Sequence, residues 1–450
     1  MSLDRRRFVH KLAGSQTPAG SEPPTSRADS MSVKGRLLER MLEELDRRNV
    51  LNADEDTVRS AVGEFVQQVL ETEELPLNAS ERGRLAQELA DDALGLGPLV
   101  PLMLDPAVSD ILVNAPGQVY AERHGRLERT DVRFRDEAHV MRVIERIAAR
   151  VGRRIDASSP MVDVRLPDGS RVNATIPPVS IDGPTISVRR FGRSRLTRRE
   201  LMRLGMMSAE MVRFLDGAVR ARASMVISGG TGAGKSTLLG ALAETIPSNE
   251  RVVTIEDTAE LVLDQEHVVR MEARPPNVEG RGEISVRDLV RNSLRMRPDR
   301  IIVGEVRGGE ALDMLQAMNT GHEGSMSTVH ANTPRDALAR LETMVLMAGL
   351  ELPSRAIREQ IVSAVSFLVH VRRFEDGVRR VESIAEIVGM EGSTPLLQEI
   401  FKFERQGRQG RRITGSFQPT GITPRDLVDW RVRGVDLPAD LFGPPGTRRG

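Results

Sequence analysis

The chain has 450 residues, with 64 basic and 64 acidic side chains and no cysteine. This length favours two or three domains over a single one. The balanced charge gives the whole molecule no net attraction for nucleic acid or anionic lipid, so any such attraction must come from a local patch. The absence of cysteine excludes disulfides and thiol catalysis, and it is compatible with a reducing compartment.

The most apolar runs, residues 97–104 and 361–371, are too short to span a bilayer. The N-terminus is basic, but no apolar stretch follows it, so it lacks the pattern of a signal peptide. We therefore expect a cytoplasmic protein that attaches to a membrane only through a partner.

The first part of the chain changes character near residue 30. Residues 1–30 are rich in Ser, Pro, Gly and Arg, and we predict a disordered tail. Residues 31–94 show helical spacing of apolar side chains, which predicts a small bundle of about three helices. We interpret the two apolar stripes as the core of this bundle, although a docking or oligomerisation element could show the same pattern. The stripes comprise Leu37, Leu38, Met41, Leu42 and Leu45, and then Val58, Val62, Phe65, Val66 and Val69.

Residues 95–192 combine β-like runs, turn signals and one helical pattern, at residues 137–151. The turn signals include Pro167-Asp168-Gly169. We predict a compact α+β domain here. The β-like runs are residues 110–113, 118–122 and 162–166.

An arginine-rich segment, residues 193–205, follows as a predicted linker. Thr197 and Glu200 have the spacing of a capping box that opens a short helix, and Gly205 stands where that helix should end. We interpret the arginines as a solvated charged surface. We expect no nucleic-acid partner, because one Trp and one Tyr in the whole chain provide no set of aromatic platforms for stacking bases.

From residue 206 to the C-terminus at residue 450, strands and helices alternate, which predicts a doubly wound α/β domain with a C-terminal extension. The expected helices are residues 209–221 and 235–244, and the expected buried strands are residues 225–228, 252–255 and 301–303.

A glycine-rich motif lies between the first of these strands and the following helix. It fits the phosphate-binding pattern G-x-x-x-x-G-K-[ST], in which backbone N–H groups and the helix N-terminus face a phosphate. Lys235 can reach the β- and γ-phosphates, and the Ser236 hydroxyl can bind Mg²⁺. The motif therefore predicts ATP and Mg²⁺ as cofactors. Its residues are Gly229, Gly230, Thr231, Gly232, Ala233, Gly234, Lys235, Ser236 and Thr237.

Two further strands end in carboxylates. Glu256 and Asp257 follow the strand at residues 252–255, and Glu305 follows the strand at residues 301–303. The carboxyl ends of parallel strands form the edge at which α/β sheets bind ligands. Hydrolysis of a nucleotide needs such a carboxylate near the metal and the attacking water.

Two histidines, His322 and His330, flank a segment rich in Gly, Ser and Thr. A zinc site would need further ligands at matching spacing, and none stands nearby, so we expect no structural zinc.

The order of these segments resembles the type II/IV secretion ATPase superfamily, in which Gly-Glu occupies the Walker B position, as Gly304-Glu305 does here. The resemblance covers about residues 35–443. Finer features are similar to the CpaF-type ATPase of the tight-adherence (Tad/Flp) pilus, and the absence of cysteine separates the chain from the zinc-containing type II secretion branch. The segments concerned are residues 254–261, 295–307 and 320–332 for the superfamily, and residues 161–173, 185–191, 383–391 and 397–401 for the CpaF type.

The resemblance implies a RecA-like ATPase domain preceded by a PAS-like α+β domain, assembled as a homo-hexamer on a polytopic inner-membrane platform protein. It implies that Glu305 activates the attacking water, that Glu256 assists or holds the water shell of the metal, and that His322 and His330 read the γ-phosphate. Candidates for stabilising the transferring phosphoryl group are Arg165, Arg171, Arg189 and Arg190.

The leading interpretation is a pilus-assembly motor driven by ATP hydrolysis. A motor for protein or DNA export is the first alternative. An ATP-gated scaffold with little turnover is the second, and an intact set of Lys235, Glu305 and the two histidines disfavours it, because a scaffold needs no activated water.

Overall fold

The computed structural model describes most of the chain in two compact units. The first unit comprises Met1–Leu166 and Val172–Arg189, and the second comprises Pro167–Arg171 and Arg190–Gly450. The predicted tail at residues 1–30 and the start of the predicted linker lie outside the described residues. Those described are residues 37, 40, 41, 44, 45, 47, 48, 55–72, 81–83, 86, 87, 89, 90, 96–123, 126–190, 196–276 and 281–443.

The helical part of the first unit has a core of its own. Helix α2 (Glu55–Thr72) buries Val62, Val66 and Val69, which recur at helical spacing. They cluster with residues of the other predicted stripe, such as Leu37 and Met41. The interpretation of the stripes as a core is confirmed for these residues.

The rest of the first unit is a six-stranded sheet with one long helix. The strand order is β3-β2-β1-β6-β5-β4. Helix α5 begins at the cap residue Asp136, whose carboxylate accepts from the His139 backbone N–H at 2.7 Å, and its apolar face packs in the core of the sheet. The predicted helix and the three predicted strands are confirmed, whereas β3, β5 and β6 were not predicted; all four side chains of β3 are exposed. The elements are η1 (Gly97–Leu99), α4 (Val100–Leu104), β1 (Val108–Ala115), β2 (Gln118–Arg123), β3 (Arg126–Arg129), α5 (Glu137–Arg150), β4 (Met161–Arg165), β5 (Arg171–Thr175) and β6 (Thr185–Arg189).

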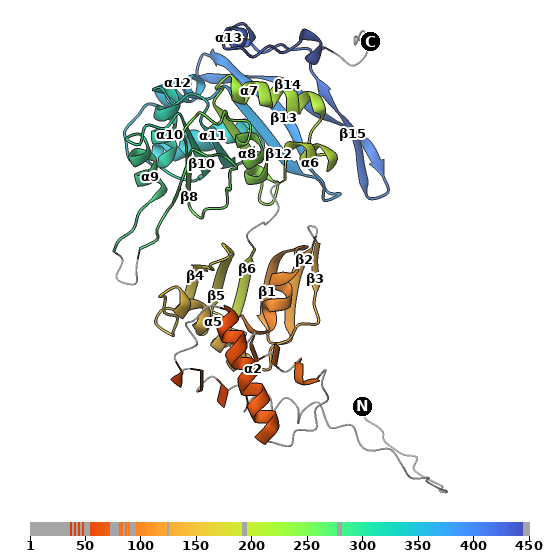
Figure 1. Ribbon diagram of the computed structural model, residues 1–450. Helices are drawn as coiled ribbons and strands as arrows, with labels where there is room; N and C mark the ends of the chain where they lie inside the picture. The colour runs from red at the N-terminus through yellow and green to blue at the C-terminus, as the bar shows by residue number, and fades with distance from the viewer. Residues whose placement is uncertain are drawn as a thin grey trace, which may run out of the picture. The chain divides into compact units, whose positions relative to one another are not determined.

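The second unit contains a nine-stranded sheet in the order β15-β14-β13-β12-β7-β11-β10-β8-β9 (Figure 1). The six strands from β12 to β9 run parallel, and β13, β14 and β15 are antiparallel to their neighbours. The strands are β7 (Met225–Gly229), β8 (Val252–Glu256), β9 (Val268–Glu272), β10 (Arg300–Val306), β11 (Met326–His330), β12 (Phe367–Arg373), β13 (Arg379–Glu391), β14 (Thr394–Gln409) and β15 (Arg412–Pro419). The helices are α6 (Arg198–Arg203), α7 (Ala209–Arg220), α8 (Lys235–Ala243), α9 (Val286–Ser293), α10 (Glu310–Asn319), α11 (Pro334–Leu346), α12 (Ser354–Ala364), α13 (Leu427–Val432) and η2 (Ala439–Leu441).

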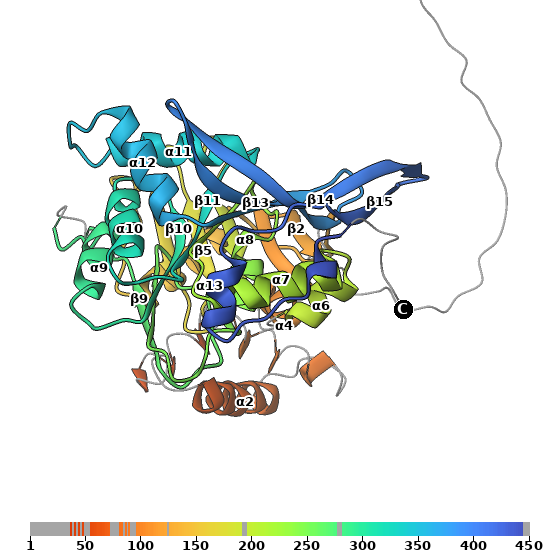
Figure 2. The same ribbon diagram turned by 90° about the horizontal axis from the view of Figure 1, so that it is seen from above.

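Helices cover both faces of the parallel strands, as the predicted doubly wound α/β arrangement requires. In β7, Met225 and Ile227 face one core, which α6, α7 and α8 complete, and Val226 faces the other, which α9 to α12 complete. Figure 2 shows these two groups of helices on opposite sides of the sheet. Burial on both faces explains why the five residues of β7 are all buried.

The C-terminal extension departs from the alternation of strands and helices that we predicted. Three antiparallel strands follow β12 without an intervening helix, and the β14–β15 hairpin projects beyond the rest of the sheet (Figure 1). Hairpins need only a short turn between strands, so this part of the sheet grows without crossover helices.

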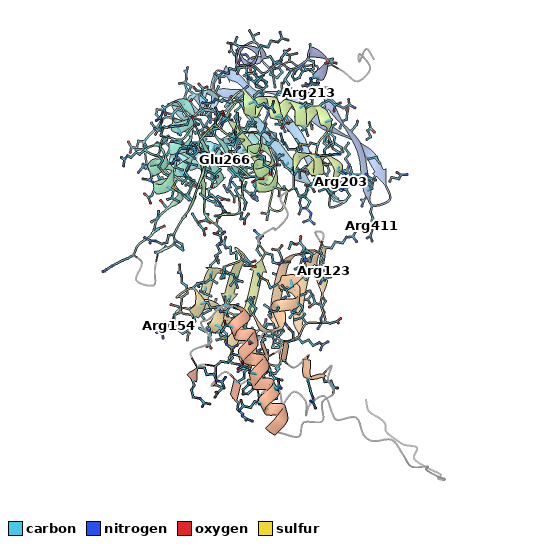
Figure 3. The ribbon with its side chains drawn as sticks, in the orientation of Figure 1. Arg123, Arg154, Arg203, Arg213, Glu266 and Arg411 are labelled. Carbon is cyan, nitrogen blue, oxygen red and sulfur yellow. The ribbon has the colours of Figure 1, made fainter. Side chains whose placement is uncertain are left out.

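Helix α6 has the caps that the sequence predicts. Thr197 and Glu200 form the capping box, and Gly205 adopts a left-handed conformation with φ of 77°. Leu201 is buried in the same core as α7 and α8, whereas Arg203 is exposed (Figure 3). The helical half of the predicted linker therefore packs as part of the second unit.

Within the described ranges, every helix is too short or too polar to cross a bilayer.

A candidate nucleotide site at the carboxyl edge of the parallel strands

The glycine-rich loop joins the central strand β7 to helix α8, as predicted. Strand β12 runs beside β7, and a Cβ atom on Gly229 would lie 2.2 Å from the Val371 carbonyl oxygen, so this position requires glycine. Gly232 and Gly234 have φ angles of 67° and 98°, which side chains other than glycine rarely adopt. The loop thus turns tightly before α8 starts at Lys235.

Two donors of the loop converge on one carbonyl oxygen. The Lys235 ammonium and the Ala233 backbone N–H both donate to the Gly230 oxygen, at 3.2 and 3.3 Å. A phosphate oxygen can accept from the same two donors. Burial lowers the pKa of Lys235, while the nearby Glu305 carboxylate opposes this shift. An added anion would therefore meet a partly desolvated ammonium, for which attraction is stronger than in water.

Glu305, the last residue but one of strand β10, lies close enough to Lys235 to interact with it electrostatically. One of its carboxylate oxygens accepts from two nitrogens of Arg307, at 2.6 and 3.0 Å. Arg307 also donates to Asp257 at 3.3 Å. Sequence reasoning gave Arg307 no role, although it directly follows β10 and stands two residues after Glu305.

Glu256 ends strand β8 at the same edge and is buried. Its Oε1 accepts from the Glu260 and Leu261 backbone N–H groups at 2.9 Å, whereas its buried Oε2 has no hydrogen-bond partner. Burial raises the pKa of Glu256 to about 7. A Cβ atom on Gly304 would lie 2.7 Å from the Glu256 side chain, which explains the glycine before Glu305.

The two histidines lie at opposite ends of strand β11. His330 ends β11 opposite Gly229 of β7 and so belongs to the edge that carries the loop. His322 precedes the strand, and its Nδ1 lies 3.0 Å from the Pro298 carbonyl oxygen, at the edge where β10 begins. A five-residue strand spans roughly 13 Å. Within one chain, His322 therefore lies at the opposite end of β11 from the loop. The expectation that the two histidines read the γ-phosphate stays a prediction.

The candidate arginines belong to the six-stranded sheet. Arg165 ends β4, Arg171 begins β5 and Arg189 ends β6. The Arg189 Nε lies 3.3 Å from the Asp110 carboxylate. Their action on a neighbouring subunit's nucleotide stays a prediction, as does that of Arg190. The structure instead reveals Arg379, remote in sequence, whose Nε donates to the Gly232 carbonyl oxygen at 2.8 Å.

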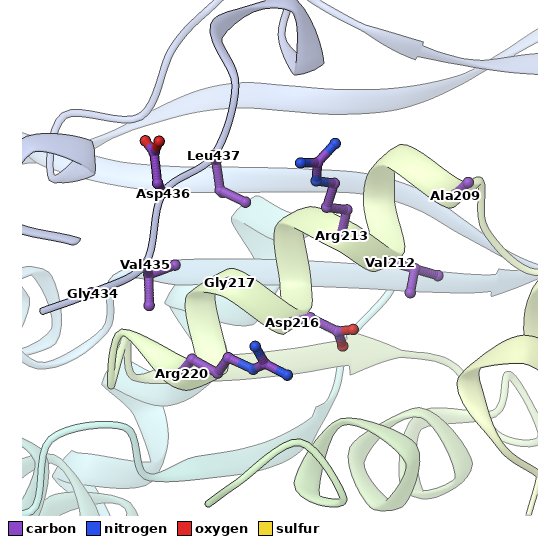
Figure 4. A pocket seen from close by; sticks show the side chains of 10 residues that line it. All are labelled: Ala209, Val212, Arg213, Asp216, Gly217, Arg220, Gly434, Val435, Asp436 and Leu437. Atoms are coloured by element: carbon purple, nitrogen blue, oxygen red, sulfur yellow. The ribbon is translucent and has the colours of Figure 1, made fainter. Parts of the chain in front are cut away.

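A surface pocket of about 400 Å³ lies away from this loop, between α7 and residues 434–437. Figure 4 shows Arg213, Asp216 and Arg220 along α7 with the C-terminal segment crossing beside them. The pocket has no glycine-rich loop and no buried carboxylate, so it does not have the chemistry of a nucleotide site.

A parallel α/β sheet with a glycine-rich loop, a lysine and two strand-end carboxylates at one edge defines the class of P-loop nucleotide-binding proteins. Comparison with known proteins agrees. Residues 92–399 match the family described as type II/IV secretion system protein, and residues 30–94 match the N-terminal domain of type II secretion system protein E. The chain belongs to the type II/IV secretion system protein family and is an ATP hydrolase.

Three relatives illustrate the match. A putative conjugal transfer protein of Mycobacterium tuberculosis is 41% identical over 68% of this chain and 88% of that protein. The type IV secretion system protein VirB11 of Brucella suis is 31% identical over 63% and 87%. The crystal structure of the VirB11 ATPase of Brucella suis, at 30% identity, covers 65% of this chain and 96% of that one with a TM-score of 0.35.

Proposed function

We propose that this chain is the ATP-hydrolysing motor of a tight-adherence (Tad/Flp) pilus. In this proposal it works as a ring hexamer on a polytopic inner-membrane platform protein and drives the addition, or removal, of pilin subunits. The observation that supports the motor chemistry is the gathering of Lys235, Glu305 and Glu256 at the edge that carries the loop. The CpaF-like segments described above support the pilus assignment.

In the proposed reaction, backbone N–H groups of the loop and Lys235 hold the triphosphate. Glu305 leaves its ion pair with Arg307, orients a water molecule in line with the γ-phosphate and accepts its proton. Arg307 is then available to balance the charge that develops on the transferring phosphoryl group. His330 contacts the γ-phosphate from the adjacent strand.

The residues present fit a magnesium ion. The Ser236 hydroxyl at the start of α8 would bind it, and the unpartnered Glu256 Oε2 would accept a hydrogen bond from its water shell. The ion supplies positive charge to the β- and γ-phosphate oxygens. Because Glu256 has a raised pKa, its carboxyl group would lose a proton when the cation binds nearby.

In the proposed ring, Arg165, Arg171 and Arg189 supply positive charge to the nucleotide of a neighbouring subunit. Such an arginine can accelerate phosphoryl transfer by about 10³ or more. Substituting each by alanine and mixing the variant with an otherwise intact Lys235→Ala chain would show whether it acts between subunits.

The test of the pilus assignment is a strain whose own copy of the chain is replaced by the Glu305→Gln variant. We expect pili to be absent and to return with the wild-type chain, and we expect the platform protein to co-purify with both. Normal piliation in the variant strain would contradict the proposal.

The second candidate is a motor for protein or DNA export, which the name of the Mycobacterium tuberculosis relative favours, since it is called a putative conjugal transfer protein. In the same strain this function predicts that piliation is retained while DNA transfer or protein secretion is lost. An ATP-gated scaffold with little turnover is disfavoured, because the chain is an ATP hydrolase.

A further inference from the structure

The turn between β12 and β13 lies against the nucleotide loop although it is remote in sequence. Strand β12 pairs with β7 along its length, with Val371 opposite Gly229. The chain then turns back, and Arg373 pairs with Arg379 across the start of the hairpin. This pairing brings both ends of the turn to the edge of the sheet that carries the loop.

The turn is held by a buried ion pair. Asp376 accepts from two nitrogens of Arg380, at 3.0 and 2.8 Å, and from the backbone N–H groups of Val378 and Ile413, both at 3.0 Å. The side chains of Asp376 and Arg380 are 3% and 7% exposed. Since Ile413 belongs to β15, the same carboxylate joins the turn to the β14–β15 hairpin.

Aromatic rings complete the support of the turn. The Arg380 guanidinium lies 5.1 Å from the ring centres of both Phe374 and Phe403, which come from the turn and from β14. A planar cation held by two rings and a bidentate carboxylate has little freedom to move. The backbone at Arg379, one residue before Arg380, is thereby fixed.

Arg379 contacts the loop directly from this rigid turn. Its Nε donates to the Gly232 carbonyl oxygen at 2.8 Å, and its Cδ lies 3.2 Å from the position that a Cβ atom on Gly234 would occupy. In a trans peptide the C=O and the following N–H point in opposite directions. Holding the Gly232 oxygen therefore aims the Ala233 N–H at the other side of the loop, where it meets the Gly230 oxygen together with Lys235.

We infer that Arg379 is a positioning residue for nucleotide binding, which presets the Gly232–Ala233 peptide so that its N–H faces a phosphate oxygen. The Asp376–Arg380 pair and the β14–β15 hairpin form the base from which it acts. This inference rests on the proposed binding of a triphosphate by the loop. It deepens that proposal by adding a residue of the C-terminal extension to the site.

The experiment measures affinity for a fluorescent ATP analogue and steady-state phosphate release for three variants of the full chain. Arg379→Ala should weaken binding and raise KM about tenfold, since a charge-assisted hydrogen bond is lost, while kcat changes less than about twofold. Arg379→Lys should restore part of the affinity, because an ammonium can donate to the same oxygen. The matched control is Arg372→Ala in the same hairpin, whose side chain pairs with Glu382 at 3.1 Å; it should bind like the wild type.

A further variant tests whether the Asp376–Arg380 pair acts on the loop through Arg379. Asp376→Asn keeps the shape of the side chain but weakens its bond to Arg380, so it should reduce affinity in the wild-type background and have no further effect in the Arg379→Ala background. Additive effects of the two substitutions would contradict this route. Thermal unfolding of each variant shows whether the chain is folded at the assay temperature.

The outcomes separate this inference from the proposed function. Wild-type affinity in a folded Arg379→Ala variant, with binding abolished in Lys235→Ala, would overturn the role of Arg379 and leave the site standing. A loss of kcat at unchanged affinity would also overturn it. Undiminished binding by Lys235→Ala would contradict the proposed site itself.

Discussion

The two edges of the parallel strands in the second unit contain the same kinds of residue, but at one edge these residues stabilise the fold and at the other they form the candidate site. At the edge where β10 begins, Arg300 is fully buried and donates to both oxygens of Glu250, at 2.6 and 3.2 Å. A further nitrogen donates to the Val219 carbonyl oxygen at 2.7 Å. A Cβ atom on Gly324 would lie 2.6 Å from this guanidinium, so the glycine is required by packing.

The opposite edge contains the same residue types, but their charged and polar groups are less fully buried or paired. Arg307 is 62% exposed and shared between Glu305 and Asp257. Glu256 keeps one buried oxygen without a partner, and its pKa is raised. Buried polar atoms normally have partners, so an orphaned oxygen at a ligand edge indicates a group that a ligand completes.

The structural edge and the site therefore differ in how completely their charged and polar groups are paired, and not in residue type. A histidine, a glycine, an arginine and a glutamate stand at both edges. At the edge that carries the loop, Arg307 is exposed and one buried oxygen of Glu256 has no partner.

The largest expected effect is on turnover. Glu305→Gln should lower kcat by about 10³, because the amide cannot accept a proton from the attacking water, while affinity for ATP is retained. The control at the other edge is Glu323→Gln, an exposed side chain paired with Arg433, which should leave kcat unchanged. Phosphate release and fluorescent-nucleotide binding measure both. An equal loss of kcat in the two variants would contradict the assignment of the site to one edge.

The next effect is on stability, from one substitution made at each edge. Arg300→Met removes the buried partner of Glu250 and leaves this carboxylate only the more distant Arg222, at 3.4 Å, so it should cost about 3–5 kcal/mol of unfolding free energy. Arg307→Met removes an exposed ion pair and should cost less than about 1 kcal/mol. Urea denaturation compares the two. A greater loss at Arg307 would reverse our assignment of the structural edge.

The third effect depends on pH. The pKa of Glu256 is raised from 4.5 to about 7 in the folded chain, so the folded state binds more protons than the unfolded state between these values. Stability contributed by this group is therefore present below pH 4.5 and is lost as the pH rises through 7. We compare the unfolding free energies of Glu256→Gln and the wild type in the absence of nucleotide and Mg²⁺. Relative to the wild type, the variant should be more stable at pH 8 than at pH 5 by on the order of 2–3 kcal/mol. Thermal unfolding of both proteins at both pH values tests this direction. A variant that is relatively more stable at pH 5 than at pH 8 would contradict it.

The smallest effect separates the two histidines. His330→Gln should lower kcat by roughly tenfold, the scale of one hydrogen bond to a charged group. His322→Gln should change kcat less than about twofold, because His322 lies at the other end of β11. A larger effect from His322 in a folded variant would contradict this separation of the two histidines.

The parts of the site that are local in sequence were predictable. The strand, the glycine-rich loop and the helix N-terminus are consecutive, and their residue types follow from phosphate chemistry, so the loop could be located without a structure. The capping box of α6 was readable for the same reason. Glu256 and Glu305 were found because each lies near the carboxyl end of an apolar strand.

The rest depended on contacts between distant segments. The ends of β11 at which the two histidines stand could not be read from the sequence, because the start of this strand, Met326-Ser327-Thr328, has little of the apolar character that marks the other strands. Arg379 contacts a loop 147 residues earlier, and no local pattern indicates that pairing. Arg300 would have been assigned to the surface, since only the fold supplies the buried Glu250 that makes its burial possible.

The most direct test of the site is a crystal structure of the chain with Mg²⁺ and a non-hydrolysable ATP analogue. We predict phosphate oxygens on the backbone N–H groups between Gly229 and Ser236, Lys235 released from the Gly230 oxygen, and the Glu305 carboxylate turned from Arg307 toward a water beside the γ-phosphate. Phosphates bound elsewhere, or a Glu305 side chain that faces away from the γ-phosphate with nucleotide in place, would contradict the account.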